Sequence, residues 1–199
     1  MKSLLLYSGG LDSTYLLHRD KPDAALFIRY GQKHLKEYWF ARQHCEDLGI
    51  PLHDLEGMRL MGSSLVGGQG NFVVPARNLF FVSLAANFAE ANGFGEILLG
   101  CNKDDHKAFP DCRSNFWIGV TEVLKLAELK VIIRVPLINF TKRKIMKELD
   151  RMGVDLDSTW SCYEGGEEPC GECEACLMRK PWAAETVRKI LQRKERSKT

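Results

Sequence analysis

Residues 7–14 read Tyr-Ser-Gly-Gly-Leu-Asp-Ser-Thr and stand between a short apolar run at 3–7 and a segment of helical period at 12–19. Two adjacent glycines let a backbone turn sharply and approach a ligand without a Cβ in the way. The N–H groups that open the following helix, aligned with its dipole, then face an anion. The octapeptide therefore predicts a phosphate-binding loop, composed of Tyr7, Ser8, Gly9, Gly10, Leu11, Asp12, Ser13 and Thr14. The alternative is a glycine turn with a Ser or Asp helix cap, which is common in isolation.

Three side chains of this loop carry chemistry. The hydroxyls of Ser8 and Ser13 are donors for phosphate oxygens. The carboxylate of Asp12 would repel bare phosphate, so it is suited to orienting the loop or to helping hold Mg²⁺. The spacing matches neither the Walker loop nor the dinucleotide fingerprint. It resembles the PP-loop of the ATP pyrophosphatases, which cleave ATP to AMP and pyrophosphate while adenylating a substrate.

Short apolar runs alternate with segments of helical period along the whole chain. The runs, rich in Leu, Ile and Val, predict strands at 3–7, 24–30, 51–55, 96–101 and 131–137. Helices are predicted at 12–19, 34–48, 77–92, 113–128, 141–152 and 177–194. This alternation predicts an α/β fold, a doubly wound parallel sheet that binds ligands beyond the carboxyl ends of its strands. The Gly-rich segment 58–72 lacks periodicity and predicts a long loop, either a lid or simply flexible.

The composition excludes several classes of protein. The chain has 199 residues, of which 45% are hydrophobic and 27% charged, so it is neither disordered nor fibrous. The net charge of +2 gives no general affinity for nucleic acid. The basic stretch 188–199 reads either as a solvated helix end or as a nucleic-acid contact. No signal peptide or apolar run of membrane length is visible, so a cytoplasmic location without a membrane partner is expected.

Four of the seven cysteines crowd into fifteen positions, at Cys162, Cys170, Cys173 and Cys176. Disulfides are not expected in a reducing compartment. Four thiolates suit a structural Zn²⁺ site, which leaves no open position for catalysis. The same spacing occurs in iron–sulfur sites, and a cluster of free thiols is a third reading. Zinc is favoured because nothing else in the sequence indicates redox chemistry. The other three, Cys45, Cys101 and Cys112, read as small buried hydrophobes.

The phosphate loop and the cysteine cluster, in this order, resemble the QueC family of 7-cyano-7-deazaguanine synthases. The resemblance runs through nearly the whole chain in five ordered blocks: 8–14, 30–34 with Glu37, 74–78, 109–113, and 160–176 with Arg179. It implies a PP-loop ATP-binding domain, like the adenine nucleotide alpha hydrolases, over 1–160. A zinc-binding knuckle with a C-terminal helix packed on it is implied over 161–199. The chain departs from the family at Ala76, where Gly is usual, at the more charged loop 102–107 and at the shorter loop 58–72.

The resemblance implies an ATP-dependent ligase that converts 7-carboxy-7-deazaguanine and ammonia to the 7-cyano product. A carboxylate is a poor electrophile, so adenylation first turns one oxygen into a leaving group. Ammonia then displaces AMP, and a second activation removes the amide oxygen. The implied cofactors are ATP, Mg²⁺ and Zn²⁺, and the implied assembly is a homodimer. The substrates are small molecules, and nucleic acid is not expected as a direct substrate.

The resemblance also implies roles for residues at the sheet edge. The catalytic set is Asp12, Ser13, His34, Arg77 and Arg113; the substrate-binding set is Tyr30, Gln32, Asn78, Asp105 and Asp111. Arg77, Lys103 or Arg113 would neutralise the substrate carboxylate or the phosphate charge. His34 is suited to proton transfer, or else is a hydrogen-bond partner at a helix start. Asp105 or Asp111 would accept hydrogen bonds from the base, although Asp111 is also a candidate cap for the following helix.

Two other functions stay open from the sequence alone. One is a PP-loop enzyme that adenylates a different acceptor, such as tRNA or another macromolecule. A catalytic thiol would favour sulfur transfer to tRNA, but Cys101 and Cys112 lack a C-x-x-C partner. The other is a zinc-knuckle nucleic-acid-binding protein with a degenerate nucleotide site. The intact loop at 8–13 argues against degeneracy.

Overall fold

A computed structural model of the chain describes residues 1–33, 36–69 and 72–180. Five strands in these ranges form one sheet, and every neighbouring pair is parallel. The strands are β1 (Ser3–Leu6), β2 (Ala24–Ile28), β3 (Leu52–Leu55), β4 (Glu96–Leu98) and β5 (Ile132–Arg134), in the spatial order β3-β2-β1-β4-β5. In β2 every residue is buried, as expected of a strand covered on both faces. The predicted parallel α/β sheet is confirmed.

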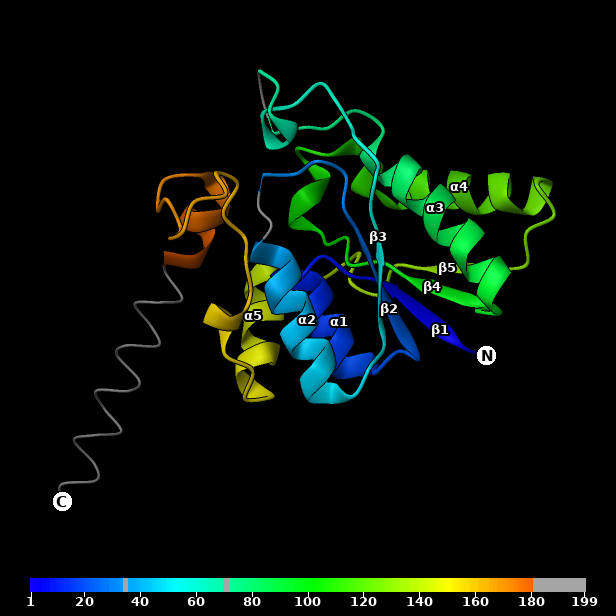
Figure 1. Cartoon of the computed structure of the whole chain (residues 1–199), viewed down its shortest axis with the longest axis horizontal. Coiled ribbons are helices and arrows are strands. Elements are labelled where there is room, and N and C mark those ends of the chain that lie inside the picture. The colour runs from blue at the N-terminus through cyan, green and yellow to red at the C-terminus, as the bar shows by residue number, and fades with distance from the viewer. Residues whose placement is uncertain (34–35, 70–71, 181–199) are drawn as a thin grey trace.

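Helices cover both faces of the sheet. They are α1 (Leu11–Asp20), α2 (Lys36–Leu48), α3 (Arg77–Asn92), α4 (Ser114–Leu126) and α5 (Lys142–Arg151). Helices α1, α2 and α5 lie on one face, and α3 and α4 lie on the other (Figure 1). Leu16 of α1 and Leu149 of α5 belong to the core of the first face, and Ala85 of α3 and Trp117 of α4 to that of the second. The fold is therefore doubly wound, as predicted. None of the helices described is long and apolar enough to cross a membrane.

The chain changes direction across the sheet between β1 and β4. After β1 the chain enters α1 on one face, and after β4 it continues to α4 on the opposite face. The connections therefore separate above the carboxyl ends of these two neighbouring strands. In open α/β sheets this divergence leaves the crevice that binds ligands. The phosphate loop, which follows β1, lies at that crevice.

Several predicted boundaries were wrong by a few residues. The strand predicted at 131–137 is only Ile132–Arg134, because β5 pairs solely with β4, which is itself three residues long. The helix predicted to begin at 177 begins at 174, so Cys176 lies within its first turn. The remainder of that helix and the basic stretch 188–199 lie outside the described residues, as do residues 34 and 35 at the start of the helix predicted over 34–48.

The long loop at 58–72 is packed over most of its described length. Ser63 begins a short 3-10 helix, Ser64–Val66, and its hydroxyl accepts a hydrogen bond from the backbone N–H of Leu65. Leu65 and Val66 are buried against Tyr30 and Val74. Beyond this loop, Ala76 precedes α3 with φ 56° and ψ 19°, a left-handed conformation that favours glycine. This conformation gives a physical reason for the glycine that is usual at this position in the family that the sequence resembles.

Candidate active site

The hydroxyls of the phosphate loop fix its shape. The Oγ atoms of Ser8 and Ser13 are 3.0 Å apart, and the backbone N–H of Gly10 donates to Ser8 Oγ at 3.3 Å. Gly10 precedes α1 with an extended backbone, and its residue type offers no side chain to cap the helix. Beneath the loop, the buried hydroxyls of Tyr7 and Thr14 lie 3.2 Å apart. The N–H groups of the first turn of α1 are thereby left to face a ligand, as an anion site requires.

Gly9 is required by both its conformation and its neighbours. Its φ is +75°, and an added Cβ would clash with the backbone carbonyl of Glu37. Gly9→Ala is expected to destabilise the fold by about 3 kcal/mol or more and to abolish ATP turnover, because the loop must move. Gly49 is a matched control, since its φ is +65° but nothing lies within 4 Å of the position that a methyl group would take. Gly49→Ala should cost only about 1 kcal/mol, and thermal unfolding separates the two cases. Equal losses in both variants would contradict this account.

A charged cluster lies beside the loop and was only partly predicted. Lys142, the first residue of α5, places its Nζ 2.8 Å from Asp12 Oδ2 and 3.6 Å from Asp105 Oδ1. The buried Asn102 donates from Nδ2 to both carboxylates, at 3.2 Å to Asp12 and 2.7 Å to Asp105. Sequence reasoning missed Lys142 and Asn102. The one available signal was a lysine at a helix start, where the helix dipole disfavours a cation.

The charges of this cluster depend on one another. Burial opposes the charge of Lys142, but the carboxylates of Asp12 and Asp105 outweigh it and raise the pKa of the lysine. Burial raises the pKa of Asp105, and Asp12 raises it further while Lys142 opposes the shift. The other oxygen of Asp12, Oδ1, is buried and has no hydrogen-bond partner among the described residues. A buried, unpartnered carboxylate oxygen beside a phosphate loop fits a ligand for Mg²⁺.

A cavity opens from the phosphate loop across the carboxyl edge of the sheet, and we call it the main cavity. The loop after β1, the ends of β2 and β4, and the start of α3 all contribute to its wall. On the side of the cysteine cluster it is lined by Trp160, Ser161, Tyr163 and Ala175. Of the predicted site residues, the lining includes Tyr7, Ser8, Gly10, Leu11, Asp12, Ser13, Tyr30, Gln32, Arg77, Asn78 and Asp105. Segments far apart in the sequence thus meet at one site.

Arg77 and Glu37 both line the main cavity and interact electrostatically. Burial raises the pKa of Glu37 to about 8, although the guanidinium of Arg77 opposes the shift. Burial raises the pKa of Tyr30, and the nearby guanidinium of Arg77 opposes the shift. The Tyr30 ring packs edge-on against Phe81, with 5.0 Å between the ring centroids. This region offers a cation, a carboxyl group and aromatic faces within one pocket. It can bind a flat, polar, ring-shaped ligand.

Two predicted substrate-binding residues are engaged with the backbone. Gln32 accepts a hydrogen bond from the N–H of Tyr30 at 2.8 Å and donates to the carbonyl of Ile28 at 3.4 Å. Asp111 accepts a hydrogen bond from the backbone N–H of Asn78 at 3.4 Å, so it caps α3 and not the helix that follows it. The Asn78 amide donates to the Asp111 carbonyl at 3.2 Å. Both residues support the wall of the main cavity.

Two predicted cations do not reach the main cavity. Arg113 is exposed, and its Nε donates to the carbonyl of His106 at 2.8 Å. Lys103 is also exposed and does not contribute to the lining. Their sequence positions next to short 3-10 helices turn both side chains outward. His34, the predicted proton-transfer residue, lies outside the described residues.

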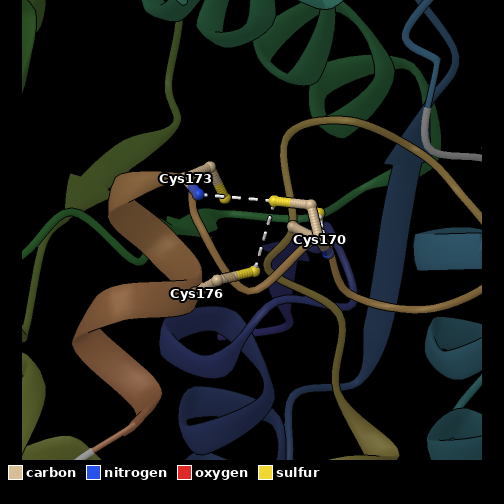
Figure 2. A group of neighbouring side chains, drawn as sticks. Cys170, Cys173 and Cys176 are labelled. Carbon is tan, nitrogen blue, oxygen red and sulfur yellow. Dashed lines mark hydrogen bonds between the residues drawn. The ribbon is translucent and has the colours of Figure 1, made fainter.

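The four predicted metal ligands come together. The sulfur atoms of Cys162, Cys170, Cys173 and Cys176 all lie within 4.8 Å of one another. Figure 2 shows three of these side chains converging, with 3.9 Å between the sulfurs of Cys170 and Cys176. The N–H groups of Glu172 and Cys173 donate to the Cys170 sulfur, and they lower the pKa of this thiol to about 7. Four such sulfurs fit a tetrahedral metal ion, because Zn–S bonds of about 2.3 Å place sulfurs slightly under 4 Å apart.

The segment that carries the cysteines covers the phosphate loop. The backbone N–H of Trp160 donates to the carbonyl of Gly9 at 3.2 Å, and the Trp160 indole donates to the Cys162 carbonyl at 3.0 Å. Arg179 donates to the carbonyls of Leu156 and Thr159. A metal that folds this segment therefore also fixes one wall of the main cavity.

Known proteins resemble this chain over nearly its whole length. Residues 2–186 match the family model described as Queuosine biosynthesis protein QueC. The 7-cyano-7-deazaguanine synthase of Psychromonas ingrahamii is 36% identical over 200 residues, covering 89% of this chain and 90% of the relative. That of Caldicellulosiruptor saccharolyticus is 34% identical over 211 residues, covering 96% and 92%. Among solved structures, a predicted subunit of tRNA methyltransferase from Methanocaldococcus jannaschii aligns with a TM-score of 0.48 at 14% identity, covering 81% of this chain and 92% of that one. The match over nearly all of its length shows that the chain belongs to the QueC family of queuosine biosynthesis proteins.

Proposed function

We propose that this QueC-family chain is an ATP-dependent 7-cyano-7-deazaguanine synthase. It joins 7-carboxy-7-deazaguanine and ammonia into the 7-cyano product, and this product is the one in the names of its relatives. The observation that carries the proposal is the phosphate loop opening onto the main cavity, with Lys142 ion-paired to Asp12 at the junction. This arrangement places a phosphate site, a cation and a ring-binding pocket in one continuous space.

The reaction begins with adenylation. A substrate carboxylate oxygen attacks the α-phosphorus of ATP, and pyrophosphate leaves. Ammonia then attacks the activated carbon, a C–N bond forms, and AMP leaves with the former carboxylate oxygen. A second ATP activates the amide oxygen in the same way. When AMP departs with that oxygen, the nitrogen loses its two protons and the nitrile remains.

The phosphate loop and its neighbours supply the electrostatics of both activations. The N–H groups of the first turn of α1 and the hydroxyls of Ser8 and Ser13 bind the phosphates that become pyrophosphate. Lys142 stabilises charge that builds on the α-phosphate, and Asp105 positions the lysine. Mg²⁺ held by Asp12 would neutralise charge on the phosphates. In this proposal Lys142 neutralises the phosphate charge, a role that the sequence analysis gave to Arg113 among other cations.

The opposite region of the main cavity binds the deazapurine ring. Its lining includes Arg77 and Asn78 from the start of α3, together with Tyr30 and Glu37. Arg77 pairs with the substrate's carboxylate or carbonyl, and Glu37 accepts hydrogen bonds from its amino-pyrimidine edge. Gln32 and Asp111 act as positioning residues, because they hold the backbone of Tyr30 and Asn78.

Other features of the protein enter as parts of the same proposal. The metal of the four-cysteine cluster is zinc, supported by its closed, four-sulfur ligand set. The chain divides into an ATP-binding unit at 1–160 and a zinc knuckle with its helix at 161–199. It works in the cytoplasm, where the thiols stay reduced. It forms a homodimer; support comes from the family resemblance and from α4, which exposes Ile118, Val123 and Leu126.

The proposal is tested by incubating the purified protein with ATP, Mg²⁺, ammonium and 7-carboxy-7-deazaguanine. AMP, pyrophosphate and a product of nitrile mass are expected, and Asp12→Ala should remove all three. Mass spectrometry identifies the product. AMP release with a different acid or with tRNA, and none with the deazaguanine acid, would keep the ATP chemistry and overturn the substrate.

A further inference from the structure

A second, smaller cavity adjoins the main cavity at the charged cluster, and we call it the side cavity. Six residues line the side cavity alone: Asp104, Ala108, Met146, Glu174, Met178 and Arg179. Lys142 and Asp105 line both cavities, so the two meet beside the phosphate loop. In the proposed reaction, the activated carbon lies at this junction. The outer residues Asp104, Ala108 and Glu174 are exposed. The side cavity therefore runs from the surface of the protein to the reaction centre.

The size of the side cavity limits what it can admit. Its volume is about 40 Å³. One buried water needs roughly 10–15 Å³ of such space, so the side cavity admits molecules of the size of water or ammonia. A purine-like ring or a nucleotide does not fit. Those larger substrates must enter through the main cavity, and once bound there they cover its opening.

The charge of the side cavity favours a small cation. Carboxylates stand at its outer end, at Glu174 and Asp104, and at its inner end, at Asp105. Lys142 is ion-paired with Asp12 and Asp105, and Arg179 donates to backbone carbonyls while keeping its charge. The three carboxylates of the lining therefore outnumber its two cations. A narrow passage lined by carboxylates raises the local concentration of cations. In neutral solution the nitrogen donor of the proposed reaction is mostly ammonium, which matches this passage in both size and charge.

We propose that the side cavity is the entry path for ammonium, and this inference rests on the proposed function. Ammonium enters beside the helix that follows the cysteine cluster while the acyl adenylate fills the main cavity. At the junction ammonium first gives one proton to water, and the lone pair of the resulting ammonia forms the C–N bond. The bond from carbon to the AMP oxygen then breaks, and a second proton passes to water. Separate entry paths allow the nitrogen donor to bind after the adenylate has formed, without reopening the main cavity to bulk water.

The test narrows the passage and leaves the main cavity intact. Ala108→Phe fills the side cavity from an exposed position, and Lys107→Phe on the same loop lines neither cavity and serves as the matched control. The KM for ammonium should rise at least tenfold in Ala108→Phe and stay unchanged in Lys107→Phe. Exchange of labelled pyrophosphate into ATP, measured with the acid and without ammonium, should be normal in both. Glu174→Gln should raise the KM for ammonium by about threefold at low salt, and less at high salt.

The outcomes separate this inference from the proposed function. If the wild-type protein shows no pyrophosphate exchange with the deazaguanine acid, the proposed function fails. If exchange is normal and the KM for ammonium is the same in Ala108→Phe as in the wild type, the entry path is wrong. Met178→Phe narrows the same cavity from another position of its lining and replaces Ala108→Phe should that variant fail to fold.

Discussion

Replacing Lys142 by alanine is expected to lower kcat for AMP formation about 10³-fold, the scale typical of removing one preorganised charge at a reacting centre. The Nζ of Lys142 lies beside the carboxylate of Asp12 at the opening of the phosphate loop. As pyrophosphate leaves, negative charge builds on the phosphates, and no solvent rearrangement is needed if the lysine is already in place. The KM for ATP should change less than kcat, because the loop N–H groups still bind the phosphates. Quenched-flow measurement of AMP gives both values.

Two controls test the role of Lys142: a substitution of another lysine on α5, and a substitution of Lys142 itself that keeps its charge. Lys147 is exposed on α5, and Lys147→Ala should stay within about twofold of the wild type, since an exposed charge at that distance is screened. Lys142→Arg keeps the positive charge and should retain more activity than Lys142→Ala. Circular dichroism verifies that each variant is folded. If the Lys142→Ala variant keeps more than a tenth of the wild-type kcat, Lys142 does not stabilise the transition state and its proposed role is wrong.

Loss of the metal should have the largest effect on stability. The wild-type protein is expected to be colourless and to contain one zinc per chain. Cys173→Ser should lose the zinc and become several kcal/mol less stable, or insoluble, because metal binding of a closed cysteine site is coupled to the folding of its segment. ATP turnover should fall as a consequence, since Trp160 no longer holds the carbonyl of Gly9. Metal analysis and thermal unfolding measure the two effects.

Cys45 provides the matched control for Cys173. It is a buried cysteine in the core between α2 and the sheet, away from the cluster. Cys45→Ala should keep its zinc and lose about 1 kcal/mol by removing one buried atom. If the purified wild-type protein is brown and absorbs visible light, the four cysteines bind an iron–sulfur cluster and the assignment of zinc is wrong. Full zinc content in Cys173→Ser would show that this cysteine is not a ligand.

The sequence predicted the features that depend on local pattern. The alternation of apolar runs and helical periods predicted all five strands, and the spacing of the cysteines predicted a cluster that the structure confirms. Strand ends were less predictable, because they depend on the partner: β5 stops where β4 offers no further residues to pair. Contacts between distant segments were missed for the same reason. Lys142 reads as an exposed lysine until the packing of α5 on α1 brings it to Asp12.

Arg113 illustrates the opposite error. It stands in a block resembling those of the QueC family and precedes a helix, which suggested a cation facing the substrate. In the structure the turn at Pro110–Cys112 directs the chain so that the guanidinium lies outside and bonds to His106. A position in the sequence places the backbone at the sheet edge. The direction in which the side chain points depends on the geometry of the turn, and this geometry cannot be read from the sequence motif alone.

The contact between Trp160 and Gly9 has a consequence for how the protein is made. The two residues are 151 positions apart, yet the carbonyl of Gly9 accepts its hydrogen bond from Trp160, and Ala175 completes the same cavity wall. A ribosome makes the phosphate loop among its first products and the wall that closes it much later, after all five strands. During that interval the nascent chain has its sheet but lacks a sealed site for an acyl adenylate. The wall of the cavity is therefore complete only after the segment that carries the cysteines has been made and has packed on the phosphate loop.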